Sequence, residues 1–504
     1  MSLSTFAGFE VARSGLNTSQ TALNVVNHNI SGAGVNGYSR QEALQAANRP
    51  YTVPGLRTPV SAGQLGTGVT VEQIKRYRDQ FADLQYRKEN QFYGEAEAKQ
   101  TFLSQIETAY NEPSNTAIRA NLDAFWQGLQ TLADNAESTA NRTSLKEIAL
   151  KLTDSVNAVA KQLEVLWQDA DDEISNNVKD VNSLLIDICS LNKSIVQVEV
   201  TGQNANDYRD ARDNLLDELS KKINMQYEEQ EDGSVNVYIA GKLAVSGTSC
   251  SEIRIVKETV EDDDFDGLFT GQKINKLVWA DMGEEVDITS GTLKGLKDIR
   301  DEMIPDYLNQ LDNLMNTLAA EINKLHKEGF GLNENTKSNR DFFTSSDTSG
   351  TAVVGKPHFA KYITVNPAIC NDVSKIAASN VAPTDTRGDG STKEANNVVA
   401  KQMADVCKKK CGIPPGSAVA HTTLNDYYQS SMTKLGTDSD KVSATLANKE
   451  ILLNGILDRR DSVSGVNEDD EMINMLKFQR TYSSSARIIT AYDEMLQTIL
   501  NMGA

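Results

Sequence analysis

The sequence predicts a multidomain α plus β protein, in which an elongated antiparallel helical rod formed by the N- and C-terminal regions carries β-rich domains inserted at its distal end. Three observations favour this fold class. Heptad patterns occur at both ends, residues 95–201 contain almost no helix breakers, and two later segments change to a strand-like or irregular composition. At 504 residues the chain is also too long for a single core.

Both ends of the chain combine few charges with a seven-residue apolar repeat. Only Glu10, Arg13, Arg40 and Glu42 are charged among the first 48 residues. Heptads with apolar a and d positions form a seam for another helix, although two ordinary amphipathic helices packed on separate domains remain the alternative. The predicted assembly interface consists of Phe9, Leu16, Leu23, Val26, Ile30, Met475, Phe478, Tyr482, Ile489, Tyr492, Leu496 and Ile499.

Long helices are predicted for residues 95–201, where Pro113 and Gly128 are the only proline and glycine. Apolar residues keep helical spacing over residues 145–166 and continue over 174–195 with a slight phase shift. Such a stutter indicates an elongated antiparallel rod, and a compact bundle is the alternative.

Strand-like alternation begins at residues 235–239, and a turn is predicted at Gly241-Lys242. A helical pattern returns over Leu293–His326, and a stretch rich in Gly, Ser, Thr, Asn and Asp follows it. The resulting division is: terminal coiled-coil segments 1–45 and 466–504, a helical rod domain 46–225 and 420–465, a β-rich domain 226–290, a linking helix 291–330, and a second β-rich outer domain 331–419.

The composition excludes several classes of partner. A formal net charge of -20 and a pI near 4.8 argue against binding to nucleic acid or to anionic membrane. The chain has no apolar run long enough to span a membrane, and its first residues lack the pattern of a secretory signal peptide. An odd number of sparse cysteines predicts mostly free thiols at Cys189, Cys250, Cys370, Cys407 and Cys411.

No catalytic, cofactor-binding or metal site is predicted. Glu261–Gly267 partly matches a calcium loop, but Lys273 stands where a bidentate Glu is needed, so a solvated acidic loop is favoured. Cys407–Cys411 is half of a metal or redox motif without a second ligand pair, and two surface thiols are the simpler interpretation. The histidines are scattered outside known catalytic motifs, at His28, His326, His358 and His421.

The stretch NHNISGAGVNGYSRQ, residues 27–41, resembles the signature of the bacterial flagellar axial proteins, which include rod, hook and hook-associated proteins. The usual Thr-Pro is replaced by Val35-Asn36, but Asn36-Gly37 can still form a tight turn. The predicted turn motif consists of Asn29, Gly37, Tyr38, Ser39, Arg40 and Gln41.

Two further stretches resemble one branch of this group, the hook-associated protein 1 family. Residues 290–333 resemble its internal segment, and residues 462–502 are similar to its C-terminal signature. Matching positions in the second stretch are Ser464, Gly465, Val466, Asn467, Glu471, Phe478, Gln479, Tyr482, Ser485, Ala486, Arg487 and Met495.

The resemblance implies a non-enzymatic structural protein of the hook–filament junction, outside the cell. It implies type III export as an unfolded chain, with terminal helices that order only on assembly. The implied partners are other copies in a ring, hook protein, the second hook–filament junction protein, and a cytoplasmic export chaperone on the C-terminal helix. The alternative within the group is a hook or distal-rod protein. The alternatives outside it are a wall hydrolase with axial termini and a coiled-coil adhesin.

Overall fold

The computed structural model describes residues 7–50, 66–114, 116–261, 267–347, 353–382, 396–413 and 422–502. Its helices are α1 (Ala7–Gly32), α2 (Gln80–Tyr110), α3 (Ile118–Asp134), α4 (Thr139–Glu199), α5 (Asn206–Lys222), α6 (Thr292–Asp298), α7 (Ile304–Glu328), α8 (Phe359–Tyr362), α9 (Pro367–Asn371), α10 (Val398–Asp405), α11 (Leu424–Ser464) and α12 (Glu468–Met502).

The strands are short and antiparallel. They are β1 (Gln41–Ala47), β2 (Val69–Arg76), β3 (Met225–Glu229), β4 (Val235–Ile239), β5 (Lys242–Ser246), β6 (Ser249–Cys250), β7 (Ile253–Thr259), β8 (Lys273–Trp279), β9 (Phe343–Ser345) and β10 (Ile363–Val365). They pair as β1-β2, β3-β4-β5-β6, β7-β8 and β10-β9.

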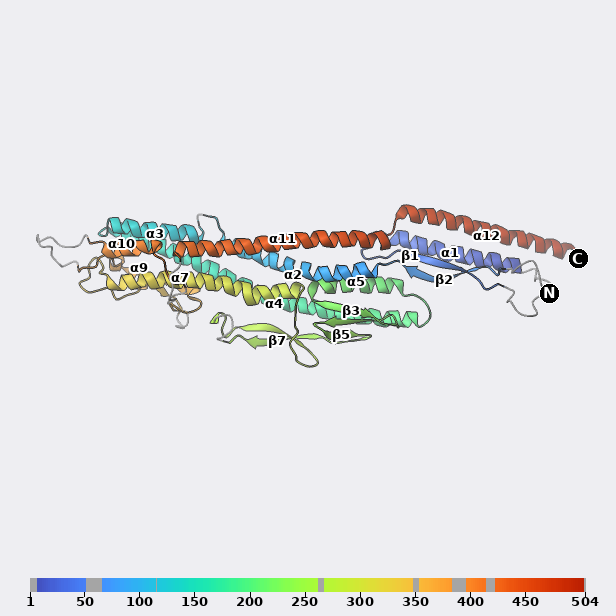
Figure 1. Cartoon of the computed structure of the whole chain (residues 1–504), viewed down its shortest axis with the longest axis horizontal. Helices are drawn as coiled ribbons and strands as arrows, with labels where there is room; N and C mark the ends of the chain where they lie inside the picture. The colour runs from blue at the N-terminus through green and yellow to red at the C-terminus, as the bar shows by residue number, and fades with distance from the viewer. Residues whose placement is uncertain are drawn as a thin grey trace.

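The molecule is elongated, as Figure 1 shows. Helices α1 and α12 lie side by side at one end, together with the β1–β2 hairpin. Helices α3, α9 and α10 lie at the opposite end, and α11 runs along the body between the two ends.

Helix α4 is the central helix of the body, which is the part of the molecule between its two ends. It spans 61 residues and begins at the N-cap Ser138, whose side chain accepts a hydrogen bond from the Asn141 amide. Its buried stripe includes Leu145, Leu152 and Leu163, which pack into the main hydrophobic core. The long helices predicted for residues 95–201 are therefore confirmed.

The strand prediction for residues 235–239 is also confirmed. Val235, Val237 and Ile239 are buried, while the residues between them are partly exposed. Ala240 and Gly241 both have positive φ, which is typical of a two-residue hairpin turn before Lys242.

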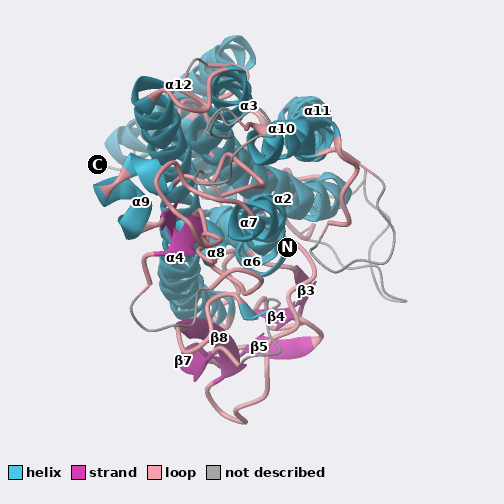
Figure 2. Ribbon diagram, turned by 90° about the vertical axis from the view of Figure 1, so that its left-hand side faces the viewer, coloured by secondary structure: helices cyan, strands magenta, loops and turns pink. Residues whose placement is uncertain are grey.

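The position predicted for this first β-rich region is wrong. Strands β3, β5 and β7 lie beside α4 in the middle of the long axis rather than at the end away from the termini (Figure 1), and Figure 2 shows the larger strands gathered on one side of the helices. Asparagines on α4 hold the strands there. The Asn192 side chain donates to the Val235 carbonyl oxygen at 2.9 Å, and the Asn182 side chain donates to the Ile253 carbonyl oxygen at 2.8 Å.

The helix predicted over Leu293–His326 is confirmed as α6 and α7, joined by a π-helical turn over Ile299–Met303. Pro305 follows this turn and has no amide hydrogen to donate to the preceding turn, which explains the local widening. Buried Arg300 fills the turn and pairs with Asp171 of α4 at 2.6 Å.

The description of residues 331–419 as β-rich is wrong for the residues that the structure describes. They contain the three-residue strands β9 and β10, and otherwise short helices and loops. Polar side chains of α7 satisfy the loop backbone in place of a strand ladder. Asn323 accepts hydrogen bonds from the Phe342 and Phe343 amides at 2.8 and 2.9 Å, and Asp312 accepts from the Ala360 amide at 2.7 Å.

The predicted break near residues 462–471 is confirmed, since α11 ends at Ser464 and α12 begins at Glu468. The β1–β2 hairpin was not predicted. Within the described ranges, the structure contains no helix with the length and apolar character needed to cross a membrane.

Candidate assembly site at the paired terminal helices

Small residues let α1 and α12 approach closely. A Cβ atom added to Gly8 would lie 1.9 Å from the Tyr492 hydroxyl oxygen, and one added to Gly15 would lie 3.1 Å from Ser485 Oγ. Ala12, Ser19 and Ala22 are buried at helical spacing from these glycines. The seam, meaning the line of α1 residues that faces α12, therefore consists mainly of Gly, Ala and Ser. The residues predicted from the sequence for this helix are mostly large and apolar.

The predicted interface residues lie on the same two helices, and one of them, Tyr492, meets Gly8 in the seam. Val26 is buried, and Phe9, Leu16, Leu23 and Ile30 are half-buried. On α12 the half-buried residues are Met475, Phe478, Tyr482, Ile489, Tyr492 and Leu496, while Ile499 is 58 % exposed.

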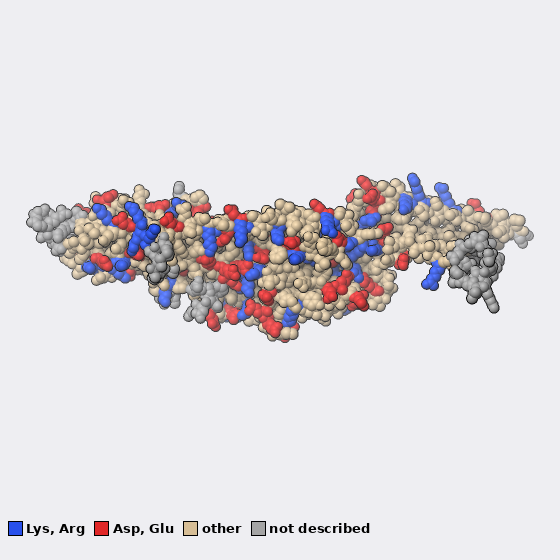
Figure 3. All heavy atoms as spheres, in the orientation of Figure 1, with Lys and Arg blue, Asp and Glu red and all other residues tan. Residues whose placement is uncertain are grey.

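A second apolar face of α12 has no cover within the described chain. Ile488, Met495, Ile499 and Met502 recur at helical spacing and are 48 %, 54 %, 58 % and 83 % exposed. Only Glu471 and Ser485 are buried in α12. Figure 3 shows little charge on the visible surface of this end, in contrast to the body.

The β1–β2 hairpin covers another side of α1. Thr18 Oγ1 donates to the Val69 carbonyl oxygen at 3.2 Å, and Ser14 Oγ accepts from the Val69 amide at 3.2 Å. Helix α1 is thus held between the hairpin and α12, while α12 has α1 as its main neighbour.

Asn29 is the centre of the turn motif and is fully buried. Its Oδ1 accepts hydrogen bonds from the Tyr38 hydroxyl at 2.8 Å and from the Gln41 amide at 3.0 Å. Its Nδ2 donates to the Gln41 carbonyl oxygen at 2.8 Å and to Glu471 Oε2 at 3.2 Å. One side chain therefore closes the turn after α1 and contacts the first turn of α12.

Arg40 makes the second link between the chain ends. Its Nε donates to Glu471 Oε1 at 2.8 Å, and its amide donates to the Ser464 carbonyl oxygen at 2.8 Å. The Glu471 side chain is only 1 % exposed. A carboxylate so deeply buried requires a charged partner, and Arg40 supplies it.

The rest of the motif joins the terminal helices to α5. Gly37 has φ +76°, and a Cβ there would lie 1.7 Å from Asn214 Oδ1, so the turn needs glycine. The Ser39 amide donates to Asp210 Oδ2 at 2.9 Å, and Gln41 Nε2 donates to Asp207 Oδ1 at 2.7 Å.

Below the motif lies a cluster of ion pairs that we call the arginine–aspartate cluster. It consists of Arg76, Arg78, Arg87, Arg460, Asp83, Asp210, Asp213 and Asp217. Arg460 Nη1 of α11 lies 2.7 Å from Asp217 Oδ2 of α5, and Arg76 Nη1 of β2 lies 2.7 Å from Asp213 Oδ2. The cluster therefore joins β2 and α2 to α5 and α11, which are distant from them in sequence.

Electrostatics within the cluster keep Asp213 charged. Burial acts to raise the pKa of Asp213, but Arg78, Arg87 and Arg76 surround the carboxylate and hold its pKa well below the usual range. Tyr38 is affected differently. Burial, with Asp207, Asp210 and Glu471 nearby, raises the pKa of its hydroxyl far above the usual value, so the hydroxyl remains a donor to Asn29.

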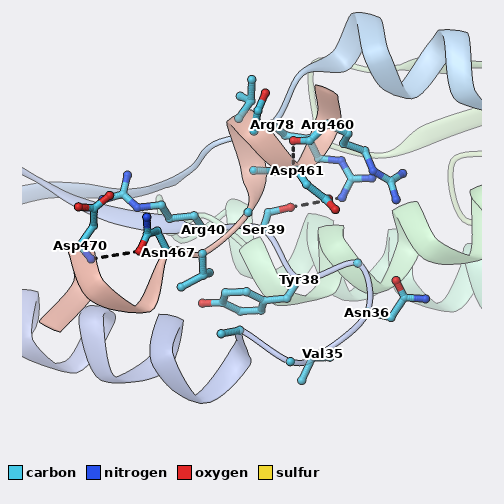
Figure 4. Close-up of a pocket in the computed structure, with 18 of the residues that line it drawn as sticks. Val35, Asn36, Tyr38, Ser39, Arg40, Arg78, Arg460, Asp461, Asn467 and Asp470 are labelled. Atoms are coloured by element: carbon cyan, nitrogen blue, oxygen red, sulfur yellow. Dashed lines mark hydrogen bonds between the residues drawn. The ribbon is translucent and has the colours of Figure 1, made fainter. Parts of the chain in front are cut away.

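A groove of about 1180 Å³ lies between the turn after α1 and the α11–α12 linker. Figure 4 shows Tyr38, Arg40, Asn467 and Asp470 around it, with Arg78 and Arg460 behind the linker. Its lining mixes cations, carboxylates and amides. Among the described residues, no group of three or more His, Cys, Asp or Glu side chains could hold a metal ion.

The chain matches two family descriptions. Residues 103–343 match "Flagellar hook-associated protein FlgK helical domain", and residues 460–502 match "Flagellar basal body rod FlgEFG protein C-terminal". It is 28 % identical over 519 aligned residues to flagellar hook-associated protein 1 of Bacillus subtilis, covering 99 % of this chain and 98 % of that protein. The chain is therefore similar, over nearly its whole length, to flagellar hook-associated protein 1.

Other relatives agree. Flagellar hook-associated protein 1 of Salmonella typhimurium is 22 % identical over 97 % of this chain and 99 % of that protein. The fold is similar to that of the flagellar hook junction protein FlgK from Burkholderia pseudomallei, with a TM-score of 0.60 and 14 % identity over 75 % of this chain and 100 % of that chain. The hook-associated protein 1 family is one of structural flagellar components rather than enzymes.

The sequence alone does not predict several residues of this site. The sequence marks Glu471 only as a match to the C-terminal signature, and it does not predict the arginine–aspartate cluster. Their signal is weak because the partners are distant in sequence: Arg40 and Glu471 are 431 residues apart. The candidate calcium ligands Asp262, Asp264 and Asp266, and His421, lie outside the described residues.

Proposed function

We propose that this chain is the structural subunit that forms the junction between hook and filament, and that it assembles through its terminal helices. Its similarity to flagellar hook-associated protein 1 supports a role as a flagellar structural component. The observation that carries the finer proposal is the uncovered apolar face of α12, formed by Ile488, Met495, Ile499 and Met502.

The energetics favour assembly-dependent ordering of segments 1–45 and 466–504. Fixing the backbone costs about 1–2 kcal/mol per residue, whereas burying a large apolar side chain contributes about 1.5–3 kcal/mol. Helix α12 buries two of its 35 residues within one chain, and both are polar. Neighbouring copies in a ring would cover the second face and supply the missing burial.

The scarcity of charge at the ends fits the same role. Dense packing of many copies around an axis would bury any charge at this surface, and burying an unpaired charge is strongly unfavourable. The last 21 residues carry only Arg487, Asp493 and Glu494. The body, which carries most of the charge, would face outward.

Export and partners follow from this proposal. We infer that the chain leaves the cell unfolded through the type III export channel, and that a cytoplasmic chaperone covers the apolar faces of α12 before export. Hook protein on one side and the second hook–filament junction protein on the other would contact the ring. The protein would then reside outside the cell.

One set of substitutions tests the assembly surface. Ile488→Asp and Met495→Asp place charge on the uncovered face of α12 without touching the seam with α1. We expect a cell carrying both substitutions to form hooks but shed filaments into the medium, while the purified monomer keeps the secondary structure of its body.

A matched control comes from the same helix. Thr490 is exposed, and its side chain hydrogen-bonds only to the Ala486 carbonyl oxygen of α12. Thr490→Asp adds one carboxylate to the same helix away from the uncovered face, and each of the two single variants, Ile488→Asp and Met495→Asp, is its matched partner; Thr490→Asp should leave filaments attached. Normal filament retention by the Ile488→Asp, Met495→Asp variant would exclude α12 as the assembly surface.

A hook or distal-rod protein is the second candidate, because residues 460–502 match a description shared by rod proteins. The helical-domain match over residues 103–343 favours the hook-associated role. A deletion strain separates the two: intact hooks without filaments indicate the junction, and missing hooks indicate the rod or hook.

A further inference from the structure

The contact between α4 and the sheet of strands β3, β4, β5 and β6 brings two of the five cysteines close together. Cys189 is buried on α4, and Cys250 is exposed in the edge strand β6. They are 61 residues apart in the sequence, and no pattern in the chain predicted their proximity.

Two asparagines fix the alignment of α4 against this part of the sheet. Asn192 Nδ2 donates to the Gly247 carbonyl oxygen at 2.7 Å, and Asn182 Oδ1 accepts from the Ile253 amide at 2.9 Å. The chain from 247 to 253 therefore runs antiparallel to α4 from 192 back to 182. Cys250 lies midway along the first segment, and Cys189 lies between the two anchors on the second.

The register of β6 points the Cys250 side chain towards α4. Cys250 pairs with Val245 of β5, and Val245 is fully buried. Directly opposed residues in an antiparallel pair project from the same face of a sheet. The Cys250 side chain therefore lies on the covered face, and it is exposed because β6 is the edge of the sheet.

The alignment places the two thiols near each other. Burial raises the pKa of the Cys189 thiol to about 12, and the neighbouring Cys250 adds to the increase. At neutral pH Cys189 is therefore protonated, and the exposed Cys250 is the thiol that an oxidant in solution reaches first.

We propose that Cys189 and Cys250 form an oxidation site that closes into a disulfide between α4 and β6 when the protein meets a peroxide. The Cys250 thiolate attacks one peroxide oxygen, the O–O bond breaks, and the leaving hydroxide takes a proton to form water. The Cys189 sulfur then attacks the Cys250 sulfenic acid. The S–S bond forms, the S–O bond breaks, and the departing hydroxide takes the Cys189 proton. Two thiols are oxidised, and one hydrogen peroxide is reduced to two waters.

The bond would fasten the edge of the sheet to the body. It closes a loop that contains α5 and strands β3, β4 and β5. At present this part of the contact is held by apolar packing and by side-chain hydrogen bonds from Asn182 and Asn192. A covalent link would limit local opening of the sheet from α4.

The test uses the full-length protein, first reduced and then exposed to hydrogen peroxide. Remaining thiols are alkylated, and the protein is digested without reductant for mass spectrometry. We expect a cross-linked peptide that joins Cys189 to Cys250 in the monomer, and loss of two alkylatable thiols. Cys250→Ser should remove the cross-link, and because Cys250 is exposed this substitution leaves the fold intact.

The other cysteines supply the matched control. Cys407→Ser with Cys411→Ser removes two thiols from a different region and should leave the Cys189–Cys250 cross-link unchanged. Overoxidation of Cys250 to sulfinic or sulfonic acid without a cross-link would overturn the proposal. So would a cross-link found only between two chains.

Discussion

The helical body around α4 and the terminal pair α1–α12 are both built from long amphipathic helices, but they bury different side chains. Helix α4 buries a continuous stripe of Leu, Val, Ile and Trp. Helix α12 buries only Glu471 and Ser485, and the α1 seam consists mainly of Gly, Ala and Ser. The body therefore contains the apolar burial that a chain needs to fold alone, and the terminal pair leaves its large apolar residues available to neighbours.

The largest expected difference between the two regions comes from removing one aromatic ring in each. Phe125 is fully buried, with its ring 5.5 Å from that of Phe343. Phe125→Ala should lower the free energy of unfolding of the monomer by about 3–5 kcal/mol. Phe9 is half-buried in the terminal pair, and Phe9→Ala should change the same quantity by less than about 1 kcal/mol. Guanidinium denaturation followed by circular dichroism measures both, and an equal loss for Phe9→Ala would remove the distinction.

Acid should act on the body through His326. Its Nδ1 donates to the Arg340 carbonyl oxygen at 2.9 Å, and its Nε2 accepts from the Ala377 amide at 3.0 Å. The neutral imidazole therefore satisfies both hydrogen bonds. Burial lowers the pKa of His326 to about 4, and nearby Glu334 and Asp341 offset this only in part. Below pH 6.5 the unfolded chain binds the proton more tightly. Stability is therefore lost as the pH falls from about 6.5 to 4, by about 3 kcal/mol at most.

The control for this experiment is the variant His326→Gln, which cannot titrate. Burial raises the pKa of Asp312 to about 7, which makes an opposite contribution, since the folded state then holds the proton more tightly as the pH falls. The difference between wild type and His326→Gln isolates the histidine. Identical pH profiles of the two proteins between pH 6.5 and 4 would contradict the assignment.

A smaller effect is expected where the two regions meet. Arg40→Ala leaves the buried Glu471 carboxylate without its cation. The substitution should weaken the contact between the N- and C-terminal segments by about 1–3 kcal/mol. We expect more filaments to be shed under mild shear, with an unchanged free energy of unfolding for the body. Glu471→Gln added to Arg40→Ala removes the unpaired charge and should restore part of the attachment. A double variant that sheds more filaments than Arg40→Ala alone would show that the ion pair is not the link.

The body was the more predictable region. Helical spacing over residues 145–195 and alternation over 235–239 each reflect burial against a single continuous core, which is why periodicity located α4 and β4 correctly. Residues 331–419 were misjudged because their Gly-, Ser- and Asn-rich composition is shared by strand-connecting loops and by loops anchored on a helix. Only the side chains of α7, such as Asn323, distinguish these cases.

The terminal site was less predictable for two physical reasons. Periodicity draws attention to large residues such as Leu16, whereas close helix approach depends on small ones such as Gly8 and Gly15. The partners of the turn motif lie hundreds of residues away. One signal was available: Arg40 and Glu42 are the only charged residues between residues 14 and 48, and a charge that becomes buried in such a segment needs a partner. That reasoning would have pointed to a buried acid, but it could not have selected Glu471.

Amide hydrogen exchange of the dilute, full-length monomer tests the central claim most directly. The account predicts rapid exchange across residues 7–32 and 468–502 and strong protection along α4, with the terminal residues becoming protected in assembled hook–filament structures. Equal protection of α1, α12 and α4 in the isolated monomer would contradict the claim that the terminal pair depends on neighbouring copies.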